Sequence, residues 1–112
     1  MLRFARPALV TTLALAGLLA GCSTVEEDKT ANWTPERIYT EARDEAQSGG
    51  YEQAVPLFEK LEGRAAGTPL AQQAQLEKAY AQYKSGEKAQ AVATLDRFMK
   101  LHPSSPAYDY AL

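Results

Sequence analysis

The strongest chemical signal in the sequence is Cys22, the only cysteine in the 112-residue chain. Its thiol is a soft nucleophile, and without a second cysteine it cannot form a disulfide within the chain. Cys22 directly follows the small residues Ala20 and Gly21, which would let the backbone enter a protease. A free cysteine is more commonly a buried structural residue, but this cysteine directly follows small residues of the kind that precede a cleavage site.

The segment that leads to Cys22 has the layout of a secretory signal. Arg3 and Arg6 make its start positive, and residues 8–20 are uncharged and mostly apolar. That apolar run is shorter than the roughly 20 residues that span a bilayer. A positive start, a short apolar middle and small residues before a cut are typical of a signal peptide, which we predict over residues 1–21.

The sequence Leu19-Ala20-Gly21-Cys22 resembles the signal box of bacterial lipoproteins. The resemblance implies that the Cys22 thiol receives a diacylglycerol, that the chain is cut before Cys22, and that the new amino group is acylated. Ser23 in place of Asp implies sorting to the outer membrane. Each buried methylene contributes about 0.8 kcal/mol, so several acyl chains would anchor the protein stably to the membrane.

Residues 22–33 are predicted to be a flexible, lipidated linker, because the segment is polar and acidic and has no apolar period. Its charge run of Glu26, Glu27 and Asp28 could alternatively be a docking site. Without residues 1–21 the chain holds ten Lys and Arg against fourteen Asp and Glu, a net charge of about −4. No basic stretch favours nucleic-acid binding.

The remainder, residues 34–112, is predicted to be all-α, since it is rich in Ala, Gln, Glu, Leu and Lys. Thr-Pro pairs at Thr34 and Thr68 are typical helix starts. Pro56 should delay the start of the second helix or kink it. Gly49 and Gly86 should end helices. The predicted helices are 34–48, 51–62, 68–85 and 88–101, with a loop at 63–67 and a fifth helix opening at Ser105-Pro106.

The helices form an internal repeat with a displacement of 37 residues. Ala42 then falls on Ala79, Gly49 on Gly86, Ala54 on Ala91, Val55 on Val92 and Phe58 on Leu95. This pattern predicts tetratricopeptide-like helical hairpins, two complete and a third begun. Alanines should occupy the helix crossings, and Phe58, Leu61, Leu95 and Phe98 should fill the space to the next hairpin.

Enzyme chemistry is not predicted. The only histidine, His102, stands at a helix end before Pro103 and suits a C-terminal cap. No nucleophile has a base at a recognisable spacing, and no metal-ligand cluster or phosphate-binding Gly-rich loop is visible. We therefore expect no cofactor, and a function in binding.

Several further stretches resemble the BamD family of the β-barrel assembly machinery. They are Ile38-Tyr39-Thr40-Glu41-Ala42, Tyr51-Glu52-Gln53-Ala54, Gln72 to Leu76, Ala79 to Lys84, Asp96 to Pro103 and Asp109 to Leu112. The resemblance implies an outer-membrane lipoprotein on the periplasmic face that binds other machinery subunits and unfolded outer-membrane β-barrel proteins. Family members carry about five hairpins, so the chain resembles an N-terminal fragment or a truncated gene product.

One loop departs from the family pattern. Many members have an aromatic, proline-rich loop after the first hairpin, where this chain reads Arg64-Ala65-Ala66-Gly67-Thr68-Pro69-Leu70. Substrate contacts through that loop are therefore not expected here. Since at least three repeats are usually needed for stability, we expect residues 33–112 alone to be marginally stable or self-associating.

A protein-binding groove is expected along the first helix of each hairpin. Spacings of three and four place its candidate residues on common helix faces. Tyrosine and arginine could bind an extended peptide that carries aromatic groups and a terminal carboxylate, although the tyrosines could instead pack in the core. The candidates are Tyr39, Arg43, Gln47, Gln73, Leu76, Tyr80, Tyr83 and Lys84.

Two other functions remain open for a lipid-anchored repeat protein. One is an adaptor for pilus or secretin assembly. The other is a regulator of cell-wall enzymes or the non-catalytic part of a hydrolase. Recovery of a secretin or a peptidoglycan synthase from solubilised envelope, without barrel-assembly subunits, would favour these alternatives.

Overall fold

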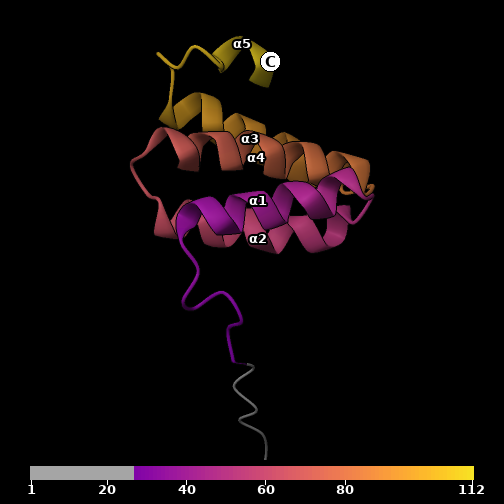
Figure 1. Cartoon of the computed structure of the whole chain (residues 1–112). Helices are drawn as coiled ribbons and strands as arrows, with labels where there is room; N and C mark the ends of the chain where they lie inside the picture. The colour runs from indigo at the N-terminus through magenta and orange to yellow at the C-terminus, as the bar shows by residue number, and fades with distance from the viewer. Residues whose placement is uncertain (1–26) are drawn as a thin grey trace, which may run out of the picture.

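The computed structural model describes residues 27–112, and this part of the chain is helical (Figure 1). Each helix packs against its neighbour in the chain, so α1 with α2 and α3 with α4 form two hairpins that are followed by α5. The predicted all-α, tetratricopeptide-like architecture is confirmed. The helices are α1 (Pro35–Gln47), α2 (Tyr51–Arg64), α3 (Pro69–Lys84), α4 (Lys88–Leu101) and α5 (Tyr108–Ala111).

The first helix of each hairpin begins with the same capping arrangement. The Thr34 hydroxyl oxygen accepts a hydrogen bond from the Arg37 backbone N–H at 3.2 Å, and Thr68 accepts one from Ala71 at 3.3 Å. A proline follows each cap, at a position where its missing N–H would have had no helical partner. Both predicted Thr-Pro starts are confirmed.

The turn inside each hairpin is also repeated. Gly49 and Gly86 have φ angles of 90° and 91°, a left-handed conformation that favours glycine. In both turns the residue after the glycine donates to a carbonyl in the last helical turn, Gly50 to Glu45 at 2.7 Å and Glu87 to Gln82 at 2.8 Å. These bonds satisfy carbonyl groups that a helix end otherwise leaves unpaired.

Small residues occupy the helix crossings, as the repeat predicts. Ala42 and Ala54 are fully buried, and Ala79 and Ala91 are at most 4% exposed. Larger side chains fill the remaining interior: Ile38, Phe58, Leu61 and Phe98 are the largest fully buried ones. Leu95 is only half-buried and Val92 is exposed, so the outer side of α4 is less covered than that of α2.

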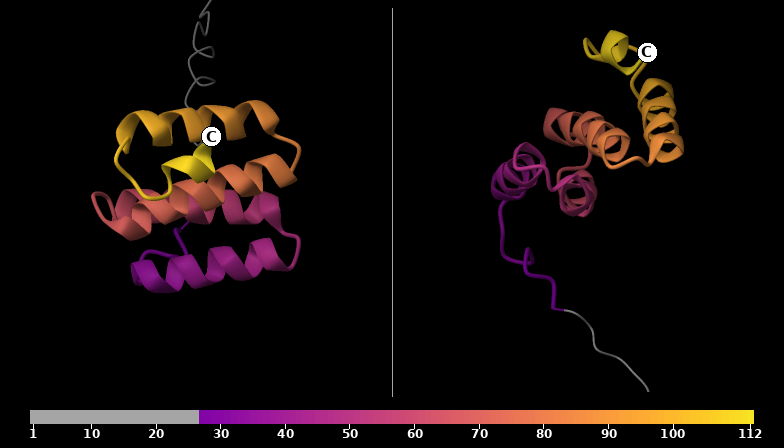
Figure 2. Two further views of the ribbon diagram at one scale, coloured as in Figure 1. Left: turned by 90° about the horizontal axis from the view of Figure 1, so that it is seen from above. Right: turned by 90° about the vertical axis from the view of Figure 1, so that its right-hand side faces the viewer.

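Helix α3 buries polar as well as apolar side chains. It packs between α2 and α4 (Figure 2), and its buried positions include Gln75, Lys78 and Gln82. Lys78 pairs with Glu62 of α2 at 3.0 Å, while Gln82 accepts a hydrogen bond from Thr94 of α4 at 2.7 Å. Because α3 is enclosed on two sides, polar pairs replace part of the apolar contact.

The second helix is longer than predicted. It begins at Tyr51, so the late start suggested by Pro56 does not occur, and it continues through Gly63 to Arg64 instead of ending near Glu62. Pro56 removes the hydrogen bond to the carbonyl of Glu52. Since both residues are exposed, solvent can take the place of the missing N–H.

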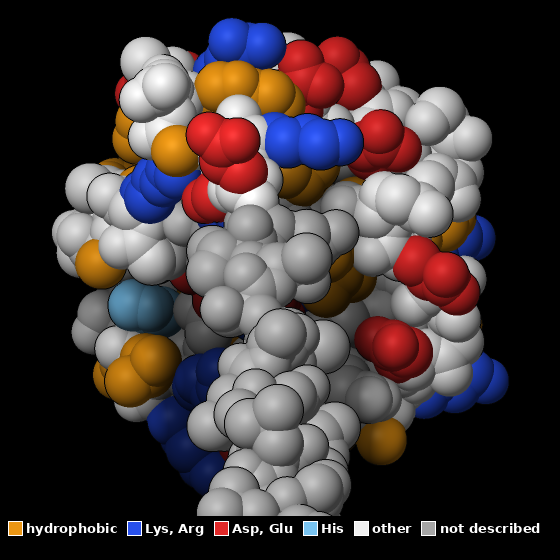
Figure 3. Space-filling model, turned by 90° about the horizontal axis from the view of Figure 1, so that it is seen from below, with side chains coloured by type: hydrophobic (Ala, Val, Ile, Leu, Met, Phe, Trp, Pro, Cys, Tyr) orange, Lys and Arg blue, Asp and Glu red, His pale blue; other side chains and the backbone are white. Residues whose placement is uncertain are grey.

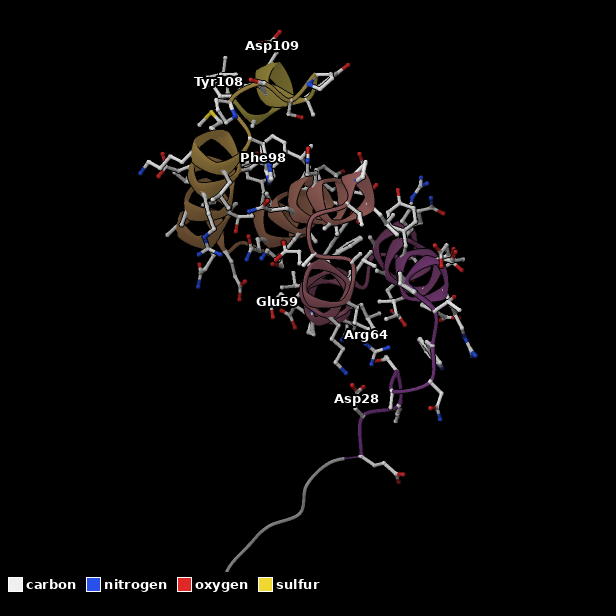
Figure 4. The ribbon with its side chains drawn as sticks, turned by 90° about the vertical axis from the view of Figure 1, so that its left-hand side faces the viewer. Asp28, Glu59, Arg64, Phe98, Tyr108 and Asp109 are labelled. Carbon is white, nitrogen blue, oxygen red and sulfur yellow. The ribbon has the colours of Figure 1, made fainter. Side chains whose placement is uncertain are left out.

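The other differences lie at the two ends of the described chain. The helix α5 begins at Tyr108 rather than at Ser105-Pro106, because Ser105 forms a turn in which its hydroxyl accepts the Ala107 N–H at 3.2 Å. At the N-terminal end, residues 28–33 were expected to belong to a flexible linker. Instead they contact α2, where Asp28 lies against Arg64 (Figure 4).

Removing a buried aromatic ring from α4 should destabilise the protein far more than removing an exposed side chain from the same helix. Phe98 is fully buried and Val92 is 66% exposed. We expect Phe98→Ala to cost about 3–5 kcal/mol of unfolding free energy and Val92→Ala to change it by less than about 0.5 kcal/mol. Urea unfolding followed by circular dichroism measures both, and similar midpoints would contradict this packing.

Candidate protein-binding groove

Three of the predicted groove residues meet at Glu77 of α3. The Tyr39 hydroxyl donates to Glu77 Oε1 at 3.2 Å, and the Gln73 side-chain amide donates to the same oxygen at 3.3 Å. The Arg43 Nε atom lies 3.8 Å from it. Glu77 therefore connects α1 with α3, the first helices of the two hairpins.

A hollow of about 230 Å³ opens beside this cluster. Its rim is polar, with Arg43, Gln47 and Glu77, while Ala46 and the buried ring of Phe58 supply apolar surface. Two tyrosines complete the lining: Tyr51 from α2 and Tyr80 from α3. The structure thus brings predicted residues from both hairpins to one site.

The two lining tyrosines form an aromatic wall. Their ring centroids are 6.1 Å apart and the rings are nearly perpendicular, at 81°, an edge-to-face contact. The Lys84 ammonium lies 6.0 Å from the centre of the Tyr51 ring. Tyr80 is 55% exposed and Tyr83 is 57% exposed, so neither packs in the core. Tyr83 does not line the hollow.

A second hollow of about 170 Å³ adjoins the first. The two share Arg43 and Gln47, and the second is otherwise lined by Tyr39, Thr40 and Asp44 of α1. Arg43 stands between them and is held from two sides, because its guanidinium lies over the Tyr39 ring at 5.6 Å and near Glu77. The shared residues make the two hollows neighbouring pockets along α1.

The surroundings of the Tyr39 hydroxyl in the groove change its pKa. Burial raises the pKa of the Tyr39 hydroxyl above its usual value, and the Glu77 carboxylate raises that pKa further, while Arg43 opposes the shift. The second carboxylate oxygen of Glu77, Oε2, is buried and accepts no hydrogen bond from the described residues. A buried acceptor without a partner is costly, so Oε2 lowers the stability gained from the other contacts of Glu77.

Sequence reasoning missed Tyr51 and Glu77. Glu77 had a usable signal, since it lies four residues after Gln73 and three before Tyr80 and so shares their helix face. Tyr51 had no such signal in the sequence. It is the first residue of α2, the second helix of its hairpin, and only the first helix of each hairpin was expected to line the groove. Leu76 was predicted on this face and is half-buried.

Other predicted features give no further site in the described part of the chain. Within residues 27–112 no cluster of His, Cys, Asp and Glu is arranged to hold a metal ion. No helix in that range combines the length and the apolar character needed to cross a membrane. Cys22, the predicted lipidation site, lies outside the described residues.

The sequence profile of the YfiO family, described as an outer membrane lipoprotein, matches residues 31–112. Similar proteins carry the name outer membrane protein assembly factor BamD. One from Neisseria meningitidis serogroup B is 45% identical in an alignment of 109 positions that covers 93% of this chain and 41% of the relative. One from Vibrio cholerae is 35% identical in an alignment of 103 positions that covers 88% of this chain and 42% of the relative. The chain thus spans about two fifths of the length of these relatives.

Replacing Glu77 with glutamine should lower the pKa of the Tyr39 hydroxyl. The neutral amide no longer disfavours the negative tyrosinate, although the burial of Tyr39 is kept. An alkaline titration followed by NMR of ¹³C-labelled tyrosine would measure the shift. Glu59→Gln removes an exposed carboxylate from α2 and should leave the Tyr39 pKa unchanged. A Tyr39 pKa that is the same in wild type and Glu77→Gln would show that this contact does not form in solution.

Proposed function

Because the chain belongs to the YfiO family of outer membrane lipoproteins, we propose that it is a lipid-anchored scaffold of the β-barrel assembly machinery. In this role it binds partner subunits and recruits unfolded outer-membrane β-barrel proteins at the periplasmic face of the outer membrane. The similar proteins named BamD support this role. Residues 1–21 serve as the signal peptide and Cys22 carries the lipid.

The observation that carries the binding role is the meeting of α1 and α3 side chains around two adjoining hollows. In an extended peptide every second side chain points to the same side, so residues i and i+2 would enter neighbouring hollows. A cavity of roughly 150 Å³ is enough for benzene, and the larger hollow, at about 230 Å³, can take an aromatic side chain. Barrel strands alternate apolar and polar residues in this way.

Charge at the rim suits the end of such a peptide. Arg43 and Lys84 are exposed cations on the groove side, although Glu77 already engages part of the Arg43 charge. A terminal carboxylate could pair with either cation. The altered loop from Ala65 to Leu70 contributes no aromatic residue. In this chain the aromatic contacts with the peptide therefore come from Tyr51 and Tyr80.

Replacing Cys22 with serine should release the protein from the membrane into the periplasm, because a hydroxyl cannot form the thioether to the lipid. The helices should keep their circular dichroism spectrum, since α1 begins only at Pro35. Fractionation of the cell envelope measures the release. Wild-type protein that is found in the soluble periplasmic fraction would contradict the anchor.

Groove substitutions should weaken binding of a peptide that carries the last strand of a β-barrel protein. We expect Arg43→Ala with Lys84→Ala to reduce affinity about fivefold, and Tyr80→Ala about tenfold or more, since aromatic residues dominate binding energy. Fluorescence anisotropy with a labelled peptide measures both.

The matched control for the charge variant is Arg97→Ala with Lys100→Ala, two exposed cations of α4. It changes the net charge by the same amount and should leave the affinity unchanged. Equal losses in the groove variant and in the control would indicate non-specific attraction between opposite charges, and unchanged affinity in Tyr80→Ala would argue against the hollow.

A pull-down from solubilised envelope separates this proposal from the two adaptor functions. Recovery of barrel-assembly subunits supports it. Recovery of a secretin, or of a peptidoglycan synthase, without those subunits would favour pilus assembly or cell-wall regulation instead.

A further inference from the structure

The segment Asp28 to Trp33, here named the N-terminal strap, is fixed to the C-terminal half of α2. The Asp28 carboxylate accepts a hydrogen bond from the Lys60 ammonium at 2.5 Å and pairs with the Arg64 guanidinium at 3.3 Å. Lys60 and Arg64 are four residues apart and so lie on one face of α2. The Lys60 contact is the main reason that the pKa of Asp28 lies far below its usual value.

Arg64 holds the rest of the strap. Its guanidinium donates to the backbone carbonyl of Trp33 at 3.1 Å and to the Thr30 hydroxyl at 3.3 Å, and it also contacts the Thr30 carbonyl. A planar guanidinium has five donors in fixed directions, and here they reach both ends of a six-residue segment. Thr30 is only 3% exposed, so this residue of the strap is packed as well as paired.

The strap also has its own folded structure. The Thr30 N–H and hydroxyl both donate to Asp28 Oδ1, at 2.9 and 2.7 Å. Two backbone turns follow, with Ala31 N–H bonded to Asp28 O at 3.0 Å and Trp33 N–H bonded to Thr30 O at 2.9 Å. Since one carboxylate organises both the turn and the contact with α2, loss of Asp28 would affect the whole strap.

The position of the strap defines an end of the molecule. It lies beyond the first hairpin, and α5 lies at the opposite end of the stack (Figure 1). Asp28 and Arg64 face one another there, far from Tyr108 and Asp109 (Figure 4). Where the chain enters this end, acidic and basic side chains are intermixed (Figure 3). Attraction to an anionic lipid surface would therefore not by itself select this end.

We propose that the N-terminal strap orients the repeat domain at the lipid surface, with the C-terminal half of α2 nearest the bilayer and α5 farthest from it. The proposal rests on the lipidation of Cys22 proposed above. Asp28 is six residues from Cys22, a reach of at most about 22 Å. Without the strap the first fixed residue would be Thr34, and the reach would be about 43 Å.

Two fluorescent probes on the lipidated full chain test this orientation. Glu59→Cys on α2 and Asp109→Cys on α5 place exposed attachment sites at the two ends. The protein is reconstituted in phosphatidylethanolamine and phosphatidylglycerol vesicles that contain a lipid with a quencher on its headgroup. We expect quenching of the Glu59 probe to exceed that of the Asp109 probe at least threefold. Equal quenching in the otherwise wild-type chain would overturn the proposal.

Variants of the strap should remove this difference. In Arg64→Ala the quenching ratio should fall toward one. Asp28 lies outside the helices, so Asp28→Asn should leave them folded, and the same loss in this variant would argue against misfolding as the cause. Arg97→Ala, on the exposed side of α4, is the matched control and should keep the wild-type ratio. A ratio that survives both strap variants would overturn the role of the strap.

Hydrogen exchange on the same samples separates the strap from the anchor. Amides of residues 30–33 should exchange at least tenfold faster in Asp28→Asn and Arg64→Ala than in wild type or Arg97→Ala. If the protein fails to bind vesicles, the proposed lipidation of Cys22 is overturned, and so is the proposed orientation, because it depends on the lipid anchor. Unchanged exchange with intact vesicle binding would instead overturn the strap alone.

Discussion

Close contact between helices at four alanines is the constraint on which the rest of the structure depends. Ala42, Ala54, Ala79 and Ala91 are at most 4% exposed, so a larger side chain at any of them would displace its neighbours. With the helices packed at these small residues, Tyr51 of α2 lies beside the α1 and α3 side chains that line the hollow. Larger residues at these crossings would move the helices apart and separate the groove residues, because close-packed interiors transmit even small changes in volume.

Local signals in the sequence predicted most of the fold. The Thr-Pro starts, the two turn glycines and the bounds of α4 were correct because caps and left-handed turns depend on a few adjacent residues. The predictions were wrong where contacts between residues distant in the sequence determine the structure. The loop was expected to begin at residue 63, but it begins two residues later because α2 continues to Arg64. The Arg64 side chain binds the strap. Only the packing of α3 between two helices could show that Tyr80 and Tyr83 are exposed.

The candidate groove was predicted less completely than the fold. Tyr39, Arg43, Gln47, Gln73 and Tyr80 do come together, because helical spacing fixes which side chains share a face. Glu77, the shared partner of Tyr39, Arg43 and Gln73, was overlooked although it lies on that face. Tyr83 and Lys84 lie outside the lining of the hollow. The strap was invisible to sequence reasoning, since a polar, acidic segment has no periodicity that reveals a partner some 30 residues away.

The polar pairs of α3 also distinguish one hairpin from the other. The alanine contacts recur every 37 residues and would fit either hairpin equally well, whereas Lys78 with Glu62 and Gln82 with Thr94 do not recur. At the equivalent place in the first hairpin Thr94 is replaced by Leu57. A chain in which α3 exchanged places with α1 would bury the Gln82 amide against a leucine, which is costly. These pairs therefore act against incorrect pairing of helices between the two hairpins, a kind of misassembly to which repeat proteins are prone.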